Sequence, residues 1–185
     1  MVQIGAGSPA INREAEGPTT PVRERADLLG NLKPTTVRMG TEEYAIRWEG
    51  DIRAVLYHSG QVMVRGEWSA KGATGRQECY YEDGNLWSVE LWLNGEREGE
   101  SIFYSRSGIV LGQGSYEGGF RVGRWIENYE DGRIQGVGDY SVVRDSNGLG
   151  IGQARTGYWT FFDQYGNPDS AKSGRYVADS KVSDQ

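Results

Sequence analysis

Short stretches in which apolar and polar residues alternate, separated by glycine-containing turns, follow one another along most of this chain. Residues 76–82 and 86–93 are two of them, rich in the aromatic and β-branched side chains that pleated strands favour. Asp83-Gly84 between them is a hairpin signal, because glycine accepts the positive φ of tight hairpin turns. Residues 94–99 then form the return turn. The pattern predicts repeated strand pairs, with further tips at Ser107-Gly108 and Glu130-Asp131-Gly132.

This unit recurs at a spacing of 24 residues, which several columns share. The turn glycines are Gly60, Gly84, Gly108 and Gly132, and a second glycine series is Gly75, Gly99 and Gly123. An aromatic column lies at Trp68, Trp92, Tyr116, Tyr140 and, in the last unit, Tyr176. One hairpin cannot bury enough apolar area alone, so neighbouring hairpins must pair edge to edge. The predicted fold class is all-β: an elongated, twisted antiparallel meander of 24-residue β-hairpin repeats.

The repeat domain is expected to span residues 41–176, in units of about 51–75, 76–99, 100–123, 124–157 and 158–176. The fourth unit is ten residues longer than the others, because Gly157-Tyr158-Trp159 follows Gly123-Arg124-Trp125 by 34 residues instead of 24. The extra residues lie near the polar, glycine-rich stretch 145–152, which predicts a flexible loop. Residues 177–185 are expected to form a polar C-terminal tail.

Residues 1–40 hold four of the five prolines and no aromatic residue, which predicts an extended or partly disordered N-terminal arm. Thr20 as cap, Pro21 at the first helical position and Gly30 at the end are compatible with a short helix over residues 21–29. A disordered tail is the alternative.

Two segments resemble the bacterial MORN-repeat variant, in which paired tyrosines, an acidic residue or asparagine, a glycine, an aromatic and a glycine-rich turn follow in order. They are residues 80–86 (YYEDGNL), continued by 94–99 (NGEREG), and 128–134 (NYEDGRI), continued by Gly138-Asp139-Tyr140. The resemblance covers about residues 51–176 and implies a β-hairpin repeat fold without catalytic residues. Members of that family are commonly labelled antitoxin-like or regarded as interaction modules. The departures are Glu90 in a glycine column, Ser105 and Asn128 in paired-aromatic positions, and the insertion.

Composition and charge exclude several classes of protein. The 185 residues carry a formal net charge of −6, which argues against a nucleic-acid-binding protein. No apolar run approaches the roughly 20 residues of a spanning helix, so no membrane insertion is expected. The first residues lack the features of a standard signal peptide, so we expect a cytoplasmic protein, or one within a larger assembly. One cysteine and one histidine exclude a disulfide framework and a cysteine-based zinc site.

Few residues offer catalytic chemistry. His58 has no nameable nucleophile or orienting partner, so a structural or surface role is expected. Cys79 is expected to be a small core residue and not a reactive thiol. The acidic pairs Glu82-Asp83 and Glu130-Asp131 precede turn glycines, which favours turn hydrogen bonding over a cation site. The glycine-rich run 148–152 lacks the Lys-Ser/Thr of a phosphate loop. We therefore expect no catalytic residue, no metal and no cofactor.

The aromatic column supports two interpretations. Its rings can pack across strands and hold the meander together, or they can dock a partner, because Tyr and Trp are enriched at binding hot spots. A single-layer sheet cannot bury both of its faces by itself. The arm is therefore expected to cover part of one face and to leave the other for a partner. The apolar side chains of the arm that suit this role are Val22, Leu28, Leu29 and Leu32.

These observations predict a non-enzymatic repeat protein that binds another protein, either antitoxin- or immunity-like or a scaffold. The acidic repeat domain would suit a basic partner. The candidate partner-binding residues are Trp68, Trp92, Tyr116, Tyr140 and Tyr176. The alternative is a structural subunit of a virion or multiprotein complex that is anchored by its N-terminal arm.

Overall fold

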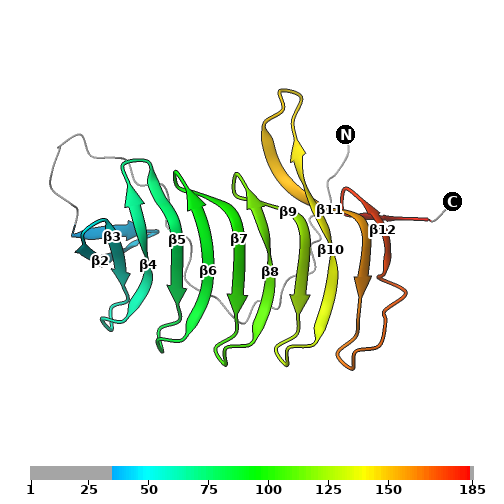
Figure 1. The fold of residues 1–185 in the computed structure, drawn as a ribbon, viewed down its shortest axis with the longest axis horizontal. Helices are drawn as coiled ribbons and strands as arrows, with labels where there is room; N and C mark the ends of the chain where they lie inside the picture. The colour runs from blue at the N-terminus through cyan, green and yellow to red at the C-terminus, as the bar shows by residue number, and fades with distance from the viewer. Residues whose placement is uncertain (1–34, 184–185) are drawn as a thin grey trace.

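A computed structural model describes residues 35–183 of the chain, and this part consists of strands and turns. Thirteen strands pair in sequence order into one open sheet, and every pairing is antiparallel (Figure 1). The predicted all-β meander is confirmed. The strands are β1 (Thr36–Met39), β2 (Glu42–Glu49), β3 (Ile52–Leu56), β4 (Val62–Ser69), β5 (Gly72–Tyr80), β6 (Leu86–Leu93), β7 (Glu96–Tyr104), β8 (Val110–Glu117), β9 (Phe120–Asn128), β10 (Ile134–Arg144), β11 (Gly150–Phe161), β12 (Gly174–Val177) and β13 (Ser180–Val182).

The predicted hairpin tips are confirmed. In the tip between β5 and β6, the Tyr81 N–H donates to the Asn85 carbonyl and the Gly84 N–H donates to the Tyr81 carbonyl, both at 2.9 Å. The tip glycines Gly60, Gly84, Gly108 and Gly132 have φ between 83° and 88°. The return turn predicted over residues 94–99 is shorter than expected. Because Asn94 and Gly95 both adopt positive φ, two residues close this hairpin and β7 already begins at Glu96.

The ten-residue insertion does not form the predicted flexible loop. It lengthens β10 and β11 into a hairpin that extends beyond the rest of the sheet (Figure 1). The Asp145 carboxylate accepts the N–H groups of Asn147 and Leu149, each at 2.9 Å, so the polar sequence builds a tight turn. An ion pair between Arg144 and Glu117, with 2.7 Å between nitrogen and oxygen, ties this hairpin to the end of β8.

Tyrosines at the tips tie each repeat to the next. Their hydroxyl groups donate to backbone carbonyls of the following hairpin. The bonds run from Tyr57 to Tyr80 at 2.7 Å, from Tyr81 to Tyr104 at 2.8 Å and from Tyr129 to Phe162 at 2.8 Å. Ser105 occupies the equivalent position of the repeat between Tyr81 and Tyr129, and it bonds within its own turn, to Ser107 and to the Ile109 N–H.

Each repeat carries a β-bulge at an equivalent place, and a glycine with positive φ lies beside it. The register between β4 and β5 shifts after Gly66, and the register between β8 and β9 shifts after Gln113. The bulge glycines are Gly75, Gly99, Gly123 and Gly157, with φ of 62°, 97°, 60° and 66°. Residues with a Cβ atom rarely adopt such values. The second glycine series of the sequence therefore marks the bulges, which increase the local twist of the sheet.

A large side chain lies flat over a glycine of the preceding strand in three of the repeats. The pairs are Gln77 over Gly66, Trp125 over Gly114 and Trp159 over Gly138. A Cβ atom on any of these glycines would lie under 3.0 Å from the covering side chain. Because glycine leaves the backbone bare, both indoles reach 0% exposure in a sheet of a single layer. Burying a side chain of this size contributes about 4–6 kcal/mol.

The same side chains bind the carbonyls at the bulges. The hydrogen bonds run from Trp125 Nε1 to Ser115 O at 3.1 Å, from Trp159 Nε1 to Asp139 O at 2.9 Å and from Gln77 Nε2 to Glu67 O at 2.8 Å. A buried carbonyl without a partner would cost about 1–3 kcal/mol. In these three repeats the bulge, the glycine and the covering side chain therefore stabilise one another.

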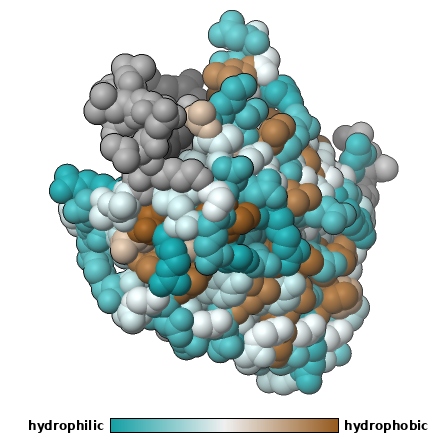
Figure 2. Space-filling view, turned by 60° about the vertical axis from the view of Figure 1, so that its left-hand side comes forward, coloured by the Kyte–Doolittle hydropathy of each residue, from teal (hydrophilic) through white to brown (hydrophobic). Residues whose placement is uncertain are grey.

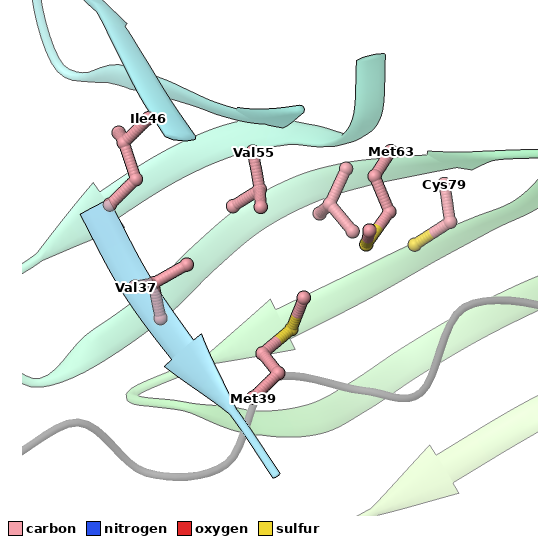
Figure 3. Close-up of a cluster of buried hydrophobic side chains, with 7 residues drawn as sticks. Val37, Met39, Ile46, Val55, Met63 and Cys79 are labelled. Atoms are coloured by element: carbon pink, nitrogen blue, oxygen red, sulfur yellow. The ribbon is translucent and has the colours of Figure 1, made fainter. Parts of the chain in front are cut away.

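The N-terminal end of the sheet is closed by β1, which folds over one face. Val37 and Met39 of β1 pack with Val55, Met63 and Cys79 in a buried cluster (Figure 3). The sheet therefore begins inside the region 1–40 that the sequence analysis assigned to the arm. In β1 the buried Val37 and Met39 alternate with exposed residues, which gives this strand one apolar face. The helix expected over residues 21–29 lies outside the described residues.

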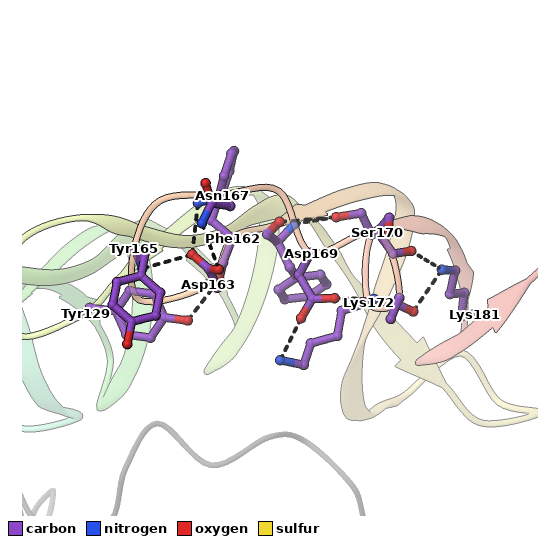
Figure 4. Close-up of polar contacts among 12 residues, drawn as sticks. Tyr129, Phe162, Asp163, Tyr165, Asn167, Asp169, Ser170, Lys172 and Lys181 are labelled. Atoms are coloured by element: carbon purple, nitrogen blue, oxygen red, sulfur yellow. Dashed lines mark hydrogen bonds and ion pairs between the residues drawn. The ribbon is translucent and has the colours of Figure 1, made fainter.

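The C-terminal end is closed by β12 and β13, so strand structure continues into the expected tail 177–185. Lys181 donates to the carbonyls of Ser170 and Ala171 at 3.1 and 2.9 Å, which holds the loop before β12 against the last strand (Figure 4). The Asp163 carboxylate organises the preceding tip through the N–H groups of Tyr165 and Asn167. A short edge strand that carries a lysine is a common protection against pairing with another chain.

We predict that Gly114→Ala lowers the free energy of unfolding by about 1–3 kcal/mol, because the new methyl group collides with the Trp125 ring. Gly152→Ala is the matched control, since Gly152 is also a strand glycine and a Cβ atom there would meet nothing within 4 Å. Urea unfolding of both variants measures the difference. Equal unfolding midpoints would contradict the flat packing of the indole.

Candidate functional site

The five aromatic residues proposed from the sequence lie on one face of the sheet, here called the aromatic face. It also carries Trp125, Trp159 and Phe161. The four residues from Trp92 onward each stand opposite a bulge glycine of the preceding strand, in the pairs Trp92–Gly75, Tyr116–Gly99, Tyr140–Gly123 and Tyr176–Gly157. Tyr116 and Tyr176 are buried, and the other three are half-buried. Packing within the sheet therefore accounts for much of their surface.

Ring contacts on this face run from β6 to β12. They connect Trp87–Phe103, Phe103–Trp125, Trp125–Tyr140, Tyr140–Trp159, Trp159–Phe161 and Phe161–Tyr176, with ring centroids 5.1–6.3 Å apart. Tyr116 joins by an edge-on contact with Trp125 at 5.3 Å. Such pairs contribute about 0.5–1.5 kcal/mol beyond area burial. Three residues of the sequence column, Tyr116, Tyr140 and Tyr176, are thus connected through Trp125, Trp159 and Phe161, which belong to other positions of the repeat.

Arginines that the sequence reasoning missed lie between the aromatic rings. Each guanidinium carbon sits over one or two ring centroids, a cation–π arrangement. For the four arginines of the aromatic face, the shortest distance is 4.1 Å for Arg53 over Trp68, 5.3 Å for Arg97 over Tyr116, 4.2 Å for Arg121 over Trp125 and 4.7 Å for Arg155 over Tyr176. Their spacing in the sequence could have identified these arginines as a further column of the repeat. Arg97 and Arg121 are 24 residues apart, and Arg155 follows after the longer unit.

Carboxylates pair with these arginines inside the face. Arg121 lies 2.8 Å from Glu127, and Arg155 lies 3.0 Å from Asp179. Arg97 pairs with Glu90, which is 1% exposed. Burial disfavours the charge of Arg97, but the Glu90 carboxylate outweighs it and raises the pKa of Arg97. The charges of the aromatic face are therefore largely neutralised internally.

Glu90, the residue that departs from the glycine column, is explained by its neighbour. Ser101 stands directly opposite Glu90, in the strand position that Gln77, Trp125 and Trp159 hold in other repeats. The small Ser101 leaves room, and the Glu90 carboxylate fills it, accepting hydrogen bonds from Ser88 at 2.7 Å and from Arg97. This repeat has exchanged a bulky side chain over glycine for a buried ion pair beside serine.

The remaining candidates for chemistry behave as turn and core residues. His58 is exposed and packs against the Tyr44 ring, with centroids 4.9 Å apart. The carboxylates of Asp83 and Asp131 each accept a backbone N–H within their own turn, at 3.0 Å, as expected for the acidic pairs. Cys79 is buried, as expected. Residues 35–183 hold no group of three or more side chains that could bind a metal ion, and no helix in this range is long and apolar enough to cross a membrane.

A family model described as MORN repeat variant matches residues 73–94, which run from the start of β5 to the turn after β6. The match covers one hairpin, which is therefore similar to a MORN repeat, in agreement with the resemblance seen in the sequence. MORN repeats are generally non-catalytic and serve repeat-based binding or structural roles. The comparison with curated proteins finds no match.

We predict non-additive stability for an exchange of the two residues that break the pattern. Glu90→Gly alone removes the buried carboxylate that pairs with Arg97, and the new ring of Ser101→Trp alone collides with Glu90. Together they restore the glycine and the covering indole of the other repeats. The double variant should be at least about 1 kcal/mol more stable than the sum of the single effects in urea unfolding. Additive changes in the free energy of unfolding would show that the side chains at positions 90 and 101 do not depend on each other.

We predict that Cys79 of the folded protein is almost inert to iodoacetamide at pH 8. Burial, with a further contribution from Glu90, raises the pKa of its thiol to about 12, so very little reactive thiolate forms. The thiol should react only after unfolding, and labelling in concentrated urea followed by mass spectrometry is the control. Equal labelling rates in the folded and unfolded protein would contradict its place in the core.

Proposed function

We propose that this chain is a non-catalytic β-repeat protein whose sheet binds a partner protein, in an antitoxin- or immunity-like role or as a scaffold. The observation that carries the proposal is the asymmetry of its single layer. The aromatic face is filled by its own rings and ion pairs, and β1 adds a cover at one end. No second layer packs on the opposite face among the described residues.

The surface supports a contact role. Figure 2 shows hydrophobic residues emerging in separate patches between hydrophilic ones on the side that it presents. Leu91, Leu93 and Tyr158 of the sheet are 40%, 54% and 59% exposed. Leu91 and Leu93 lie on the same strand, β6, and neighbouring exposed apolar residues are typical of interaction sites. The net charge of −6 favours a basic partner.

A structural subunit of a larger assembly is the second candidate. The chain has 34 residues before the described part, enough to reach about 110 Å when extended. Both ends of the sheet are closed by short strands, so assembly by endless edge-to-edge pairing of sheets is disfavoured. Such a subunit would therefore be anchored through its N-terminal residues.

Deletion of residues 1–34 separates the two functions, because it removes the proposed anchor and keeps the sequence of every described strand, from β1 onward. The partner is first isolated with the full chain from the native source and identified by crosslinking and mass spectrometry. We expect the deleted protein, with its strand-type circular dichroism unchanged, to bind that partner within about threefold of the full-chain affinity. Loss of binding by the folded deletion variant would favour the subunit anchored by its arm.

A further inference from the structure

The face opposite the aromatic rings carries a row of aliphatic side chains that crosses the strands. Val89 of β6 stands opposite Ile102 of β7, and Ile126 of β9 stands opposite Val137 of β10, with Gln113 of β8 between the two pairs. Directly opposed residues of a sheet share a face. All four aliphatic residues are half-buried. We call this row the aliphatic face.

Acidic residues flank the row on one side. Glu98 and Glu100 of β7 are exposed, and neither carboxylate takes part in an ion pair with another described residue. Glu98 accepts the Gly118 N–H at 2.9 Å, which fixes its position. Leu91 and Leu93, both exposed, extend the apolar surface beside them.

The basic residues on this face of β5 to β9, Arg76 and Arg124, already have partners. Arg76 lies 3.0 Å from Glu78, and Arg124 lies 3.5 Å from Asp139. The charge left uncompensated beside the aliphatic face is therefore negative.

We propose that the aliphatic face binds an amphipathic helix of a partner protein, with its apolar side on Val89, Ile102 and Ile126 and lysines or arginines beside Glu98 and Glu100. The inference rests on the proposed function and specifies the chemistry of the partner. It follows from charge complementarity, because two uncompensated glutamates beside an apolar row favour basic residues beside an apolar stripe.

The spacing of the row also fits a helix. Strands lie about 4.8 Å apart and successive turns of an α-helix about 5.4 Å apart, so a helix laid across the strands repeats its apolar side chains nearly in step with them. From β6 to β10 the row crosses four strand spacings, about 19 Å, which corresponds to about 13 helical residues.

The experiment uses the full chain and two labelled synthetic helical peptides of about 14 residues, one of Leu and Lys and one of Leu and Glu in the same pattern. Fluorescence anisotropy at low salt should show binding of the Lys peptide and none of the Glu peptide. Glu98→Gln with Glu100→Gln should weaken binding about tenfold. The matched control, Glu82→Gln with Glu130→Gln, removes two exposed charges at the tips and should change binding less than about twofold.

Ile102→Thr with Ile126→Thr tests the apolar contact, because threonine keeps the β-branched shape that suits a strand. This variant should also weaken binding about tenfold while its circular dichroism stays unchanged. An equal loss of affinity in the Glu98/Glu100 and Glu82/Glu130 variants would show that the peptide is attracted by overall charge, and would overturn the proposal. The absence of binding of the Lys peptide would also overturn it. If the natural partner binds the Glu98/Glu100 variant normally, this site is wrong and the proposed function stands.

Discussion

The structure depends on a side chain lying flat on a glycine of the neighbouring strand while its N–H group binds the carbonyl at a bulge. Trp125 on Gly114 and Trp159 on Gly138 do this with an indole, and Gln77 does it with an amide. A sheet of one layer has no second layer to bury its side chains. Lying flat solves this problem, because the backbone of the same sheet supplies the covered surface.

Other features of the molecule follow from that constraint. The bulges need glycines with positive φ, and the space opposite each bulge glycine receives the next aromatic ring. Arginines fill the gaps between rings, and their burial requires carboxylates such as Glu127 and Asp179. The side chains of the aromatic face consequently contact mainly one another. Free surface and uncompensated charge therefore lie on the opposite face. The proposed function by contact rests on this asymmetry of the two faces.

The spacing of residues in the sequence predicted much of this fold. It did not predict which side chains pair across the strands, and there is a physical reason for this. The glycine series gave the meander and its tips, because glycine at a tight turn is dictated locally. The burial of Trp125 depends on Gly114 of another strand, and the burial of Glu90 depends on Ser101. Such pairings appear only after the register is known. The insertion was wrongly expected to be a loop, since its polar composition hid a turn that Asp145 organises between strand-forming neighbours.

Hydrogen exchange of the indole N–H groups, followed by NMR, tests the central interaction most directly. The Nε1–H groups of Trp125 and Trp159 donate to strand carbonyls in the buried layer, so they should exchange as slowly as the neighbouring strand amides. Exchange of both indoles within minutes, while the amides of β9 and β11 stay protected, would show that the rings do not lie on the glycines.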